Sequence, residues 1–289
     1  MGPGGVDVPA TCAVDILGFR AVVRGPAQLI NQFRALHSAG PKWTRAFTSP
    51  SERAFAIQCA ASSSGRFQIT RDGSIWAETS RESQLLPWLD VAVNMAAVDS
   101  LRGHCLLFHA GVVASNGGGV ILPAPSGSGK TTLVAGLVNA GFQYFSDEVM
   151  VLDLATRMLL PFAKCMYVKR GARRLLATKF PTLLRDIPSL RFGRQTVWYL
   201  SPPATAWPSE PLPVRTVVFP RYVSHATTTL TEITPLRAIE HLLTQSFNLR
   251  ELGERGMRAL VSTLKGAECY ELIVGNLDQA IEEITGICR

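Results

Sequence analysis

Residues 124–132 read Ala-Pro-Ser-Gly-Ser-Gly-Lys-Thr-Thr, and this stretch decides the fold of the chain. A short apolar run at 119–122 precedes it and is typical of a buried strand. The run 131–140 after it has helical spacing, and Gly141 follows where a helix C-cap belongs. The sequence therefore predicts a glycine-rich loop between a strand and a helix, which is the setting of a phosphate-binding loop.

The residue types in this loop suit the binding of ATP and Mg²⁺. Gly127 and Gly129 let the backbone turn so that its N–H groups point at phosphate oxygens, and the following helix adds its positive N-terminal dipole. Lys130 can reach the β- and γ-phosphates, and the Thr131 hydroxyl can ligate Mg²⁺. The usual first glycine of the motif is Ala124 here. The residues expected to bind the nucleotide are Pro125, Ser126, Gly127, Ser128, Gly129, Lys130, Thr131 and Thr132.

Two adjacent acids, Asp147 and Glu148, lie between two apolar runs downstream of the loop. Phosphoryl transfer needs one carboxylate to hold the metal and one to orient or deprotonate the attacking hydroxyl. Both residues are therefore candidates, and an exposed acidic turn is the alternative interpretation. Asp153 is a weaker candidate, because it ends a predicted strand and could simply begin a turn.

A histidine and an arginine complete the set of candidates. His109 lies in the apolar run 106–114, where a single histidine is usually a core residue with its hydrogen bonds satisfied, and a catalytic role is the alternative. Arg221 follows a predicted strand. It could stabilise the charge of the transferred phosphate, as arginine does bidentately, or form a structural ion pair.

The order and spacing of these features resemble the HPr serine kinase family. His109 precedes Lys130 by 21 residues, and Asp147 follows Lys130 by 17. The chain is most similar to the HPr-kinase-related kinases of peptide-modification gene clusters, including kinases of lasso-peptide precursors. Those proteins carry a histidine-alanine strand, PSGSGK[ST] and SDE, as this chain does. The resemblance spans residues 85–287. Outside the nucleotide-binding region it includes the segments 218–222, 245–248 and 269–272.

The resemblance implies a role for each matching residue. Asp147 would be the base that receives the substrate hydroxyl proton. Glu148 would help to bind Mg²⁺ or hold His109, and His109 would support the acid pair. The glycine-rich signature of true HPr kinases has no match in the nearest region, 191–196, so HPr itself is not the expected acceptor.

The predicted fold class is α/β, with two domains. Residues 1–85 alternate short strand-like runs with turns around one helix, and we expect a small α+β N-terminal domain. Residues 86–289 would form a P-loop kinase core. The predicted antiparallel hairpin at 108–122 indicates a mixed sheet, which agrees with the HPr-kinase/PEP-carboxykinase-like type that the resemblance implies. The carboxykinase activity itself is the weakest alternative, because it needs a second set of metal ligands and the sequence shows none.

Composition favours a cytoplasmic globular enzyme. The chain has 289 residues, of which 47% are hydrophobic, without an uninterrupted apolar stretch of the length of a membrane span. The N-terminus lacks a basic region followed by an apolar core, so no secretory signal is expected. Six scattered cysteines without a CxxC pair argue against a zinc site or a disulfide framework.

The net charge of +7 is concentrated in one segment, 164–194. We expect this segment to dock an acidic peptide or protein substrate, to add contacts to the nucleotide phosphates, or to be a solvated helical face at 172–184. No nucleic-acid-binding motif accompanies it, so nucleic acid is not an expected partner. Its basic residues are Lys164, Lys169, Arg170, Arg173, Arg174, Lys179, Arg185, Arg191 and Arg194.

The leading hypothesis is an ATP- and Mg²⁺-dependent kinase that phosphorylates a serine or threonine hydroxyl of a peptide or protein. A ribosomally made natural-product precursor would fit the resemblance, which also implies a homo-oligomer. The alternatives are a regulatory protein that binds ATP and transfers nothing, a small-molecule kinase, and an ATPase without an acceptor.

Overall fold

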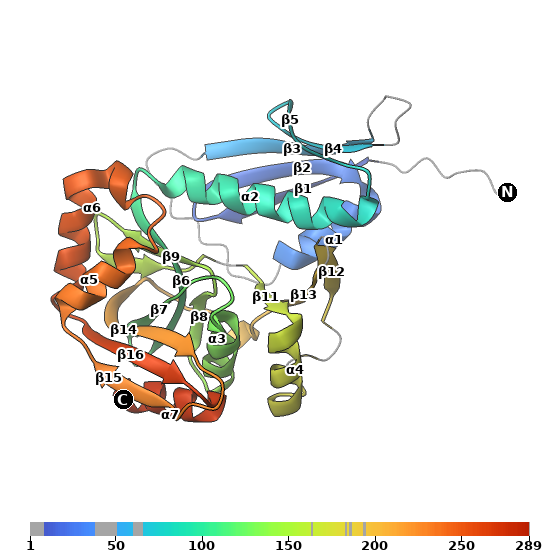
Figure 1. Ribbon diagram of the computed structural model, residues 1–289. Helices are drawn as coiled ribbons and strands as arrows, with labels where there is room; N and C mark the ends of the chain where they lie inside the picture. The colour runs from blue at the N-terminus through green and yellow to red at the C-terminus, as the bar shows by residue number, and fades with distance from the viewer. Residues whose placement is uncertain are drawn as a thin grey trace. The chain divides into compact units, whose positions relative to one another are not determined.

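The computed structural model describes residues 9–37, 51–59, 66–162, 164–182, 184, 187–192 and 195–288. They pack into two compact units (Figure 1). The first comprises residues up to 101 together with 188–197, and the second comprises 102–187 and 198–289. The first unit therefore includes the whole of helix α2 (Leu85–Leu101), whereas the sequence places the domain boundary at the start of this helix.

The first unit is built on a five-stranded sheet in the order β1-β2-β3-β4-β5. Only β2 and β3 pair in parallel, and the other neighbours are antiparallel. The sequence predicts a hairpin over 66–77 with its turn at 71–74, and the structure confirms it: β4 and β5 meet at Asp72 and Gly73, both with positive φ, as such a tight turn requires. The strands are β1 (Pro9–Ile16), β2 (Phe19–Pro26), β3 (Ser51–Cys59), β4 (Phe67–Arg71), β5 (Ser74–Thr79) and the separate β12 (Ser189–Phe192).

Two helices and a short 3-10 turn complete the first unit. They are α1 (Ala27–His37), η1 (Glu82–Gln84) and α2. The His37 ring at the end of α1 lies 2.9 Å from the Asp90 carboxylate of α2, and both side chains are buried. This contact joins the two helices inside the unit.

The second unit contains an eight-stranded mixed sheet in the order β10-β9-β6-β7-β14-β16-β15, with β8 paired to β6. Strands β6 and β7 are antiparallel, while β7, β14 and β16 run parallel to one another. The predicted mixed sheet is therefore confirmed. Its strands are β6 (Cys105–Ser115), β7 (Gly118–Pro123), β8 (Gln143–Ser146), β9 (Val149–Asp153), β10 (Met158–Leu160), β14 (Leu212–Tyr222), β15 (Thr229–Glu232) and β16 (Glu268–Val274).

Helices cover both faces of this sheet, which is why its central strands read as continuous apolar runs. The helices are α3 (Lys130–Asn139), α4 (Arg170–Lys179), α5 (Pro235–Leu243), α6 (Leu249–Leu264) and α7 (Leu277–Ile287). On β6, Val112 packs in one core with α5 and α6, and the next residue, Val113, packs in another with α3 and α7. The remaining elements are β11 (Met166–Lys169), β13 (Gln195–Leu200) and η2 (Ala204–Ala206). No helix among the described residues is long and apolar enough to cross a membrane.

One helix ends earlier than its sequence predicts. The start of α5 is as expected, because the Thr234 side chain accepts a hydrogen bond from the Arg237 N–H and Pro235 lies in the first turn. The sequence predicts one helix over about 235–248 with Thr234 as its N-cap, but α5 ends at Leu243. The buried Asn248 amide instead donates to the Cys105 carbonyl and accepts from the N–H of the neighbouring strand β6, which breaks the helix before α6 begins.

Gly111 on β6 marks the closest approach between this strand and α3. A Cβ added there would lie 2.6 Å from Val134 Cγ2 and 3.3 Å from Lys130 Cγ. Because Val134 is fully buried, it has little room to move aside. We expect Gly111→Ala to lower the free energy of unfolding by about 1–3 kcal/mol, measured by urea denaturation. Gly266→Ala is the control, since a Cβ there meets nothing within 4 Å, and an equal loss in both variants would contradict the prediction.

Candidate active site

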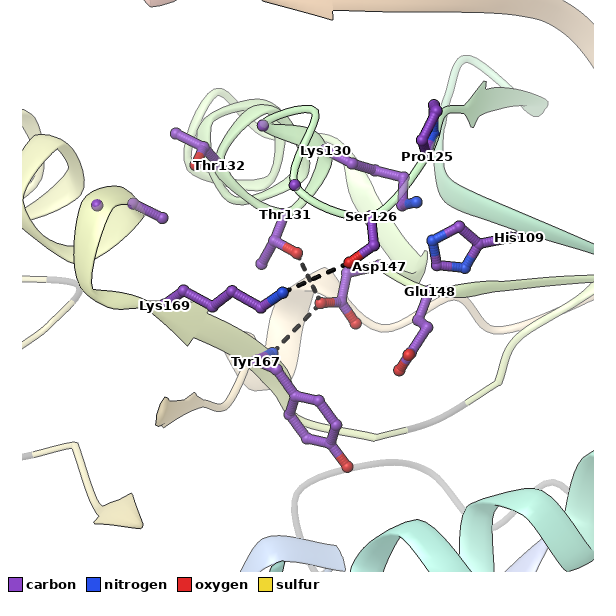
Figure 2. Close-up of a pocket in the computed structure, with 14 residues that line it drawn as sticks. His109, Pro125, Ser126, Lys130, Thr131, Thr132, Asp147, Glu148, Tyr167 and Lys169 are labelled. Carbon is purple, nitrogen blue, oxygen red and sulfur yellow. Dashed lines mark hydrogen bonds between the residues drawn. The ribbon is translucent and has the colours of Figure 1, made fainter. Parts of the chain in front are cut away.

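The predicted strand–loop–helix is present between β7 and α3. Gly127 and Gly129 have φ values of 88° and 90°, in the left-handed region that favours glycine, and Gly129 is the N-cap of α3. The loop borders a cleft of about 280 Å³ (Figure 2). Seven of the eight residues predicted to bind nucleotide line this cleft, and Ser128 faces a neighbouring cavity. The seven are Pro125, Ser126, Gly127, Gly129, Lys130, Thr131 and Thr132.

The Lys130 side chain is held beneath the loop. Only 6% of the residue is exposed, and its ammonium group donates a 2.7 Å hydrogen bond to the Ala124 carbonyl. Burial lowers the pKa of Lys130 to about 8, although the nearby carboxylates of Asp147 and Glu148 act in the opposite direction. The residue that replaces the first glycine of the motif therefore supplies a backbone acceptor that orients the lysine.

Asp147 is a buried hub of hydrogen bonds. Its Oδ2 accepts from the Thr131 hydroxyl at 3.2 Å and from the Tyr167 backbone N–H at 3.3 Å. Its Oδ1 accepts from the Tyr144 hydroxyl at 3.2 Å. Burial, and then the negative charge of Asp147, raise the pKa of Tyr144 well above its ordinary value, so this phenol remains a donor. The loop threonine and the acid pair are therefore in direct contact.

Glu148 faces the cleft in a different way from its neighbour. Its side chain is 44% exposed and it lines the cleft, whereas Asp147 is only 3% exposed. The backbone between β8 and β9 turns around Ser146, whose hydroxyl accepts from the N–H groups of Glu148 and Val149. This turn gives two adjacent acids separate environments, one enclosed and one open to a ligand.

His109 lies at the same end of the cleft. It is opposite Val149 in the β6–β9 ladder, and the next N–H, of Ala110, donates to the Glu148 carbonyl. Burial, together with the nearby Lys130 ammonium, lowers the pKa of His109, and Glu148 partly opposes this shift. The lowered pKa favours the neutral form of the ring. His109, Lys130, Asp147 and Glu148, which are spread over 40 positions of the sequence, thus line one cleft (Figure 2).

Arg221 lies elsewhere. It lines a second cavity of about 690 Å³, at the end of β14 beside the exposed Tyr222. The two cavities share Pro125 and Ser126, but Arg221 does not line the cleft of the acid pair. Asp153 is also outside the cleft: its carboxylate accepts from the Ala155 N–H and the Thr156 hydroxyl, which is the turn-forming alternative.

Three residues of the site are not among the expected catalytic, nucleotide-binding and metal residues. The Tyr167 ring and the Lys169 side chain line the cleft, and the Lys169 ammonium lies 3.5 Å from the Ser126 hydroxyl. The Lys164 ammonium lies 3.0 Å from Glu148 Oε2 and 3.3 Å from Asp147 Oδ1. Two signals in the sequence point to the lysines: the concentration of positive charge downstream of the acid pair, and the family resemblance, which matches Lys169 to a lysine and sets Lys164 against an arginine.

The basic segment does not form one continuous face. Lys164 is buried at the acid pair, Lys179 forms an ion pair with Asp278, and Arg173 stacks over the Trp198 ring at 4.8 Å. Arg191 belongs to the first unit, and Arg185 and Arg194 lie outside the described residues. The segment's helix, α4, begins two residues earlier than expected and ends at Lys179, before Pro181. The cations left exposed around the start of α4 are Lys169, Arg170 and Arg174.

The oxygen groups in the cleft fit Mg²⁺. Among the residues that the structure describes, no three His, Cys, Asp or Glu side chains gather into a metal-binding group. Mg²⁺ does not need such a group, because it is usually bound by one or two carboxylates, substrate phosphates and water. The Thr131 hydroxyl and the Glu148 carboxylate, both lining the cleft, are ligands of the required kind.

Comparisons with known proteins add little to this geometry. No family model matches the chain. No curated protein matches it. One similar solved structure is the HPr(Ser) kinase/phosphatase from Coxiella burnetii, with 12% identity over 63% of this chain and 93% of that chain, and a TM-score of 0.30. At this identity and TM-score the likeness carries no information about substrate or activity.

Proposed function

We propose that this protein is an ATP- and Mg²⁺-dependent kinase that transfers the γ-phosphate to a hydroxyl group. The observation that carries the proposal is the gathering of Lys130, Thr131, Asp147, Glu148 and His109 around one cleft at the N-terminus of α3. A protein that only binds nucleotide needs the loop and the lysine. It has no need of two acids and a neutral histidine beside them.

The proposed reaction is an in-line attack of the acceptor oxygen on the γ-phosphate. The backbone N–H groups of the loop and the Lys130 ammonium hold the phosphates and stabilise their charge. Asp147 takes the hydroxyl proton as the general base, and His109 supports the acid pair. Thr131 and Glu148 would hold Mg²⁺, which when bound neutralises charge on the β- and γ-phosphates. Arg221 would have to reach the phosphates from the second cavity, around the loop.

A serine or threonine of a peptide or protein is the proposed acceptor, and a ribosomal natural-product precursor fits the family resemblance. Lys169, Arg170 and Arg174 are exposed around the start of α4, where Gly171 and Ala172 line the cleft. Long-range attraction to these cations would favour acidic acceptors. The docking surface proposed here is therefore narrower than the whole segment 164–194.

ATP binding is expected to weaken as the pH rises through about 8. The pKa of Lys130 is lowered to about 8, so its side chain carries the positive charge below that pH and loses the charge as the pH rises above it. The terminal phosphate, with a pKa of about 6, is already ionised in this range. Bound phosphate favours the protonated form of Lys130, so the affinity for ATP should fall by up to about tenfold per pH unit above 8. Calorimetric titrations at pH 7.5, 8.5 and 9.5 test this, and Lys130→Met should bind weakly with no such slope.

The direct test is to incubate the protein with γ-labelled ATP, Mg²⁺ and matched acidic, neutral and basic serine peptides. We expect label on the serine of the acidic peptide. Release of free phosphate with every peptide would instead indicate an ATPase. Tight ATP binding with neither transfer nor release would favour the regulatory nucleotide-binding protein.

A further inference from the structure

We propose that Lys164 is an internal counter-cation of the acid pair Asp147 and Glu148, which sets how tightly the cleft binds a divalent metal and how readily it accepts a nucleotide. The inference deepens the proposed function, on which it rests. It concerns a residue of the basic segment 164–194 to which the sequence assigns no catalytic or metal-binding role.

The contacts of Lys164 are those of a built ion pair. Its ammonium nitrogen lies 3.3 Å from Asp147 Oδ1 and 3.0 Å from Glu148 Oε2, so one cation bridges both carboxylates. On another side it lies 3.6 Å from the centre of the Tyr167 ring, which is within the range of a cation–π interaction. Three groups of the cleft therefore surround a single ammonium.

Burial makes this arrangement significant. The Lys164 side chain is only 2% exposed, and an ammonium group removed from water is costly unless opposite charge surrounds it. Ion pairs of surface lysines contribute little free energy because water screens their charge. Lys164 is instead enclosed together with the Asp147 carboxylate, whose side chain is also 2% exposed. The position is thus a fixed charge of the site, in contrast to the exposed Lys169.

The consequence follows from counting charges. The two carboxylates contribute two negative charges, and the Lys164 ammonium between them offsets one of these, while the Lys130 ammonium that also faces them is the same with or without Lys164. Without the Lys164 ammonium, the cleft would carry one more unit of negative charge, so a divalent cation would bind more tightly and a triphosphate would be repelled more strongly. Removal of the Lys164 charge should therefore change the two affinities in opposite directions. Damage to the fold of the site would weaken both.

The test uses the full chain and two titrations that need no acceptor. Wild type, Lys164→Met and the exposed-lysine control Lys265→Met are titrated with Mn²⁺ alone, and separately with ATP in the presence of a chelator. We expect Lys164→Met to bind Mn²⁺ at least about tenfold more tightly and metal-free ATP at least about tenfold more weakly. The control should match wild type in both titrations.

Lys164→Arg is the second variant, because it retains the positive charge if Lys164→Met fails to fold. Its Mn²⁺ affinity should remain within about threefold of wild type. The proposal is overturned if Lys164→Met binds Mn²⁺ no more tightly than wild type, or if Lys164→Arg gains Mn²⁺ affinity although its charge is kept. A protein that shows the predicted shifts but transfers no phosphate would contradict the kinase assignment alone.

Discussion

Lys130→Ala is expected to reduce phosphate transfer by about 10³-fold and to weaken ATP binding in the same protein. The ammonium is buried, oriented by the Ala124 carbonyl, and placed below the glycine turns where the phosphates would lie. Alanine removes this buried, oriented charge, and Lys169, the exposed lysine of the cleft, lies against Ser126 at a different position of the loop. Label transfer and calorimetry with ATP measure the two effects.

The fold is expected to survive this substitution. A lysine whose pKa is lowered by burial makes an unfavourable contribution to the folded state, which is present in full below about pH 8 and fades as the pH rises toward the unfolded value. Lys130→Ala should therefore not lower the melting temperature through lost charge interactions. Lys265→Ala, at an exposed position, is the matched control. Transfer at the wild-type rate by Lys130→Ala would contradict the proposed function.

Asp147→Asn is expected to reduce transfer by about 10²–10⁴-fold while leaving ATP binding nearly intact. The amide cannot take a proton from the acceptor hydroxyl, but it has almost the same shape as the carboxylate and fills the same enclosed space. Single-turnover label transfer, compared with ATP affinity from calorimetry, separates the chemical step from binding.

A loss of stability should accompany this variant, because Asp147 accepts three hydrogen bonds and pairs with buried Lys164. Asp153→Asn controls for that loss, since Asp153 is also buried and hydrogen-bonded but lies outside the cleft. It should lower the melting temperature and retain transfer. If Asp147→Asn loses ATP binding together with transfer, Asp147 serves as a metal ligand or a structural residue. Unchanged transfer by Asp147→Asn would mean that the exposed Glu148, and not Asp147, accepts the proton.

Much of the nucleotide-binding region could be predicted from the sequence because its chemistry is local. Glycines that adopt left-handed φ, an apolar strand before them and a helical run after them are all recognisable within about 20 residues. The β6–β7 hairpin and the cap at Thr234 are local in the same sense, and both are present as predicted. The adjacency of two acids is likewise visible in the sequence, although their different burial is not.

What only the tertiary structure decided depends on contacts between distant segments. The end of α5 is set by Asn248 binding the backbone of β6, more than 140 positions away in sequence, and no helix propensity records this. The sequence correctly predicts that His109 lies in a strand and that Arg221 lies near the end of one. It does not predict that the folded sheet places the two residues at different cavities.

The sequence by itself determined the loop, its lysine and threonine, and the presence of an acid pair, because these depend on backbone conformation and residue type. The tertiary structure decided that Asp147 is enclosed and Glu148 open. It also decided that Lys164, unlike the exposed cations of the basic segment, is buried against the two carboxylates and offsets part of their charge. The physical reason is that desolvation depends on what surrounds a charge in three dimensions, and a pattern of charges along the chain does not contain that information.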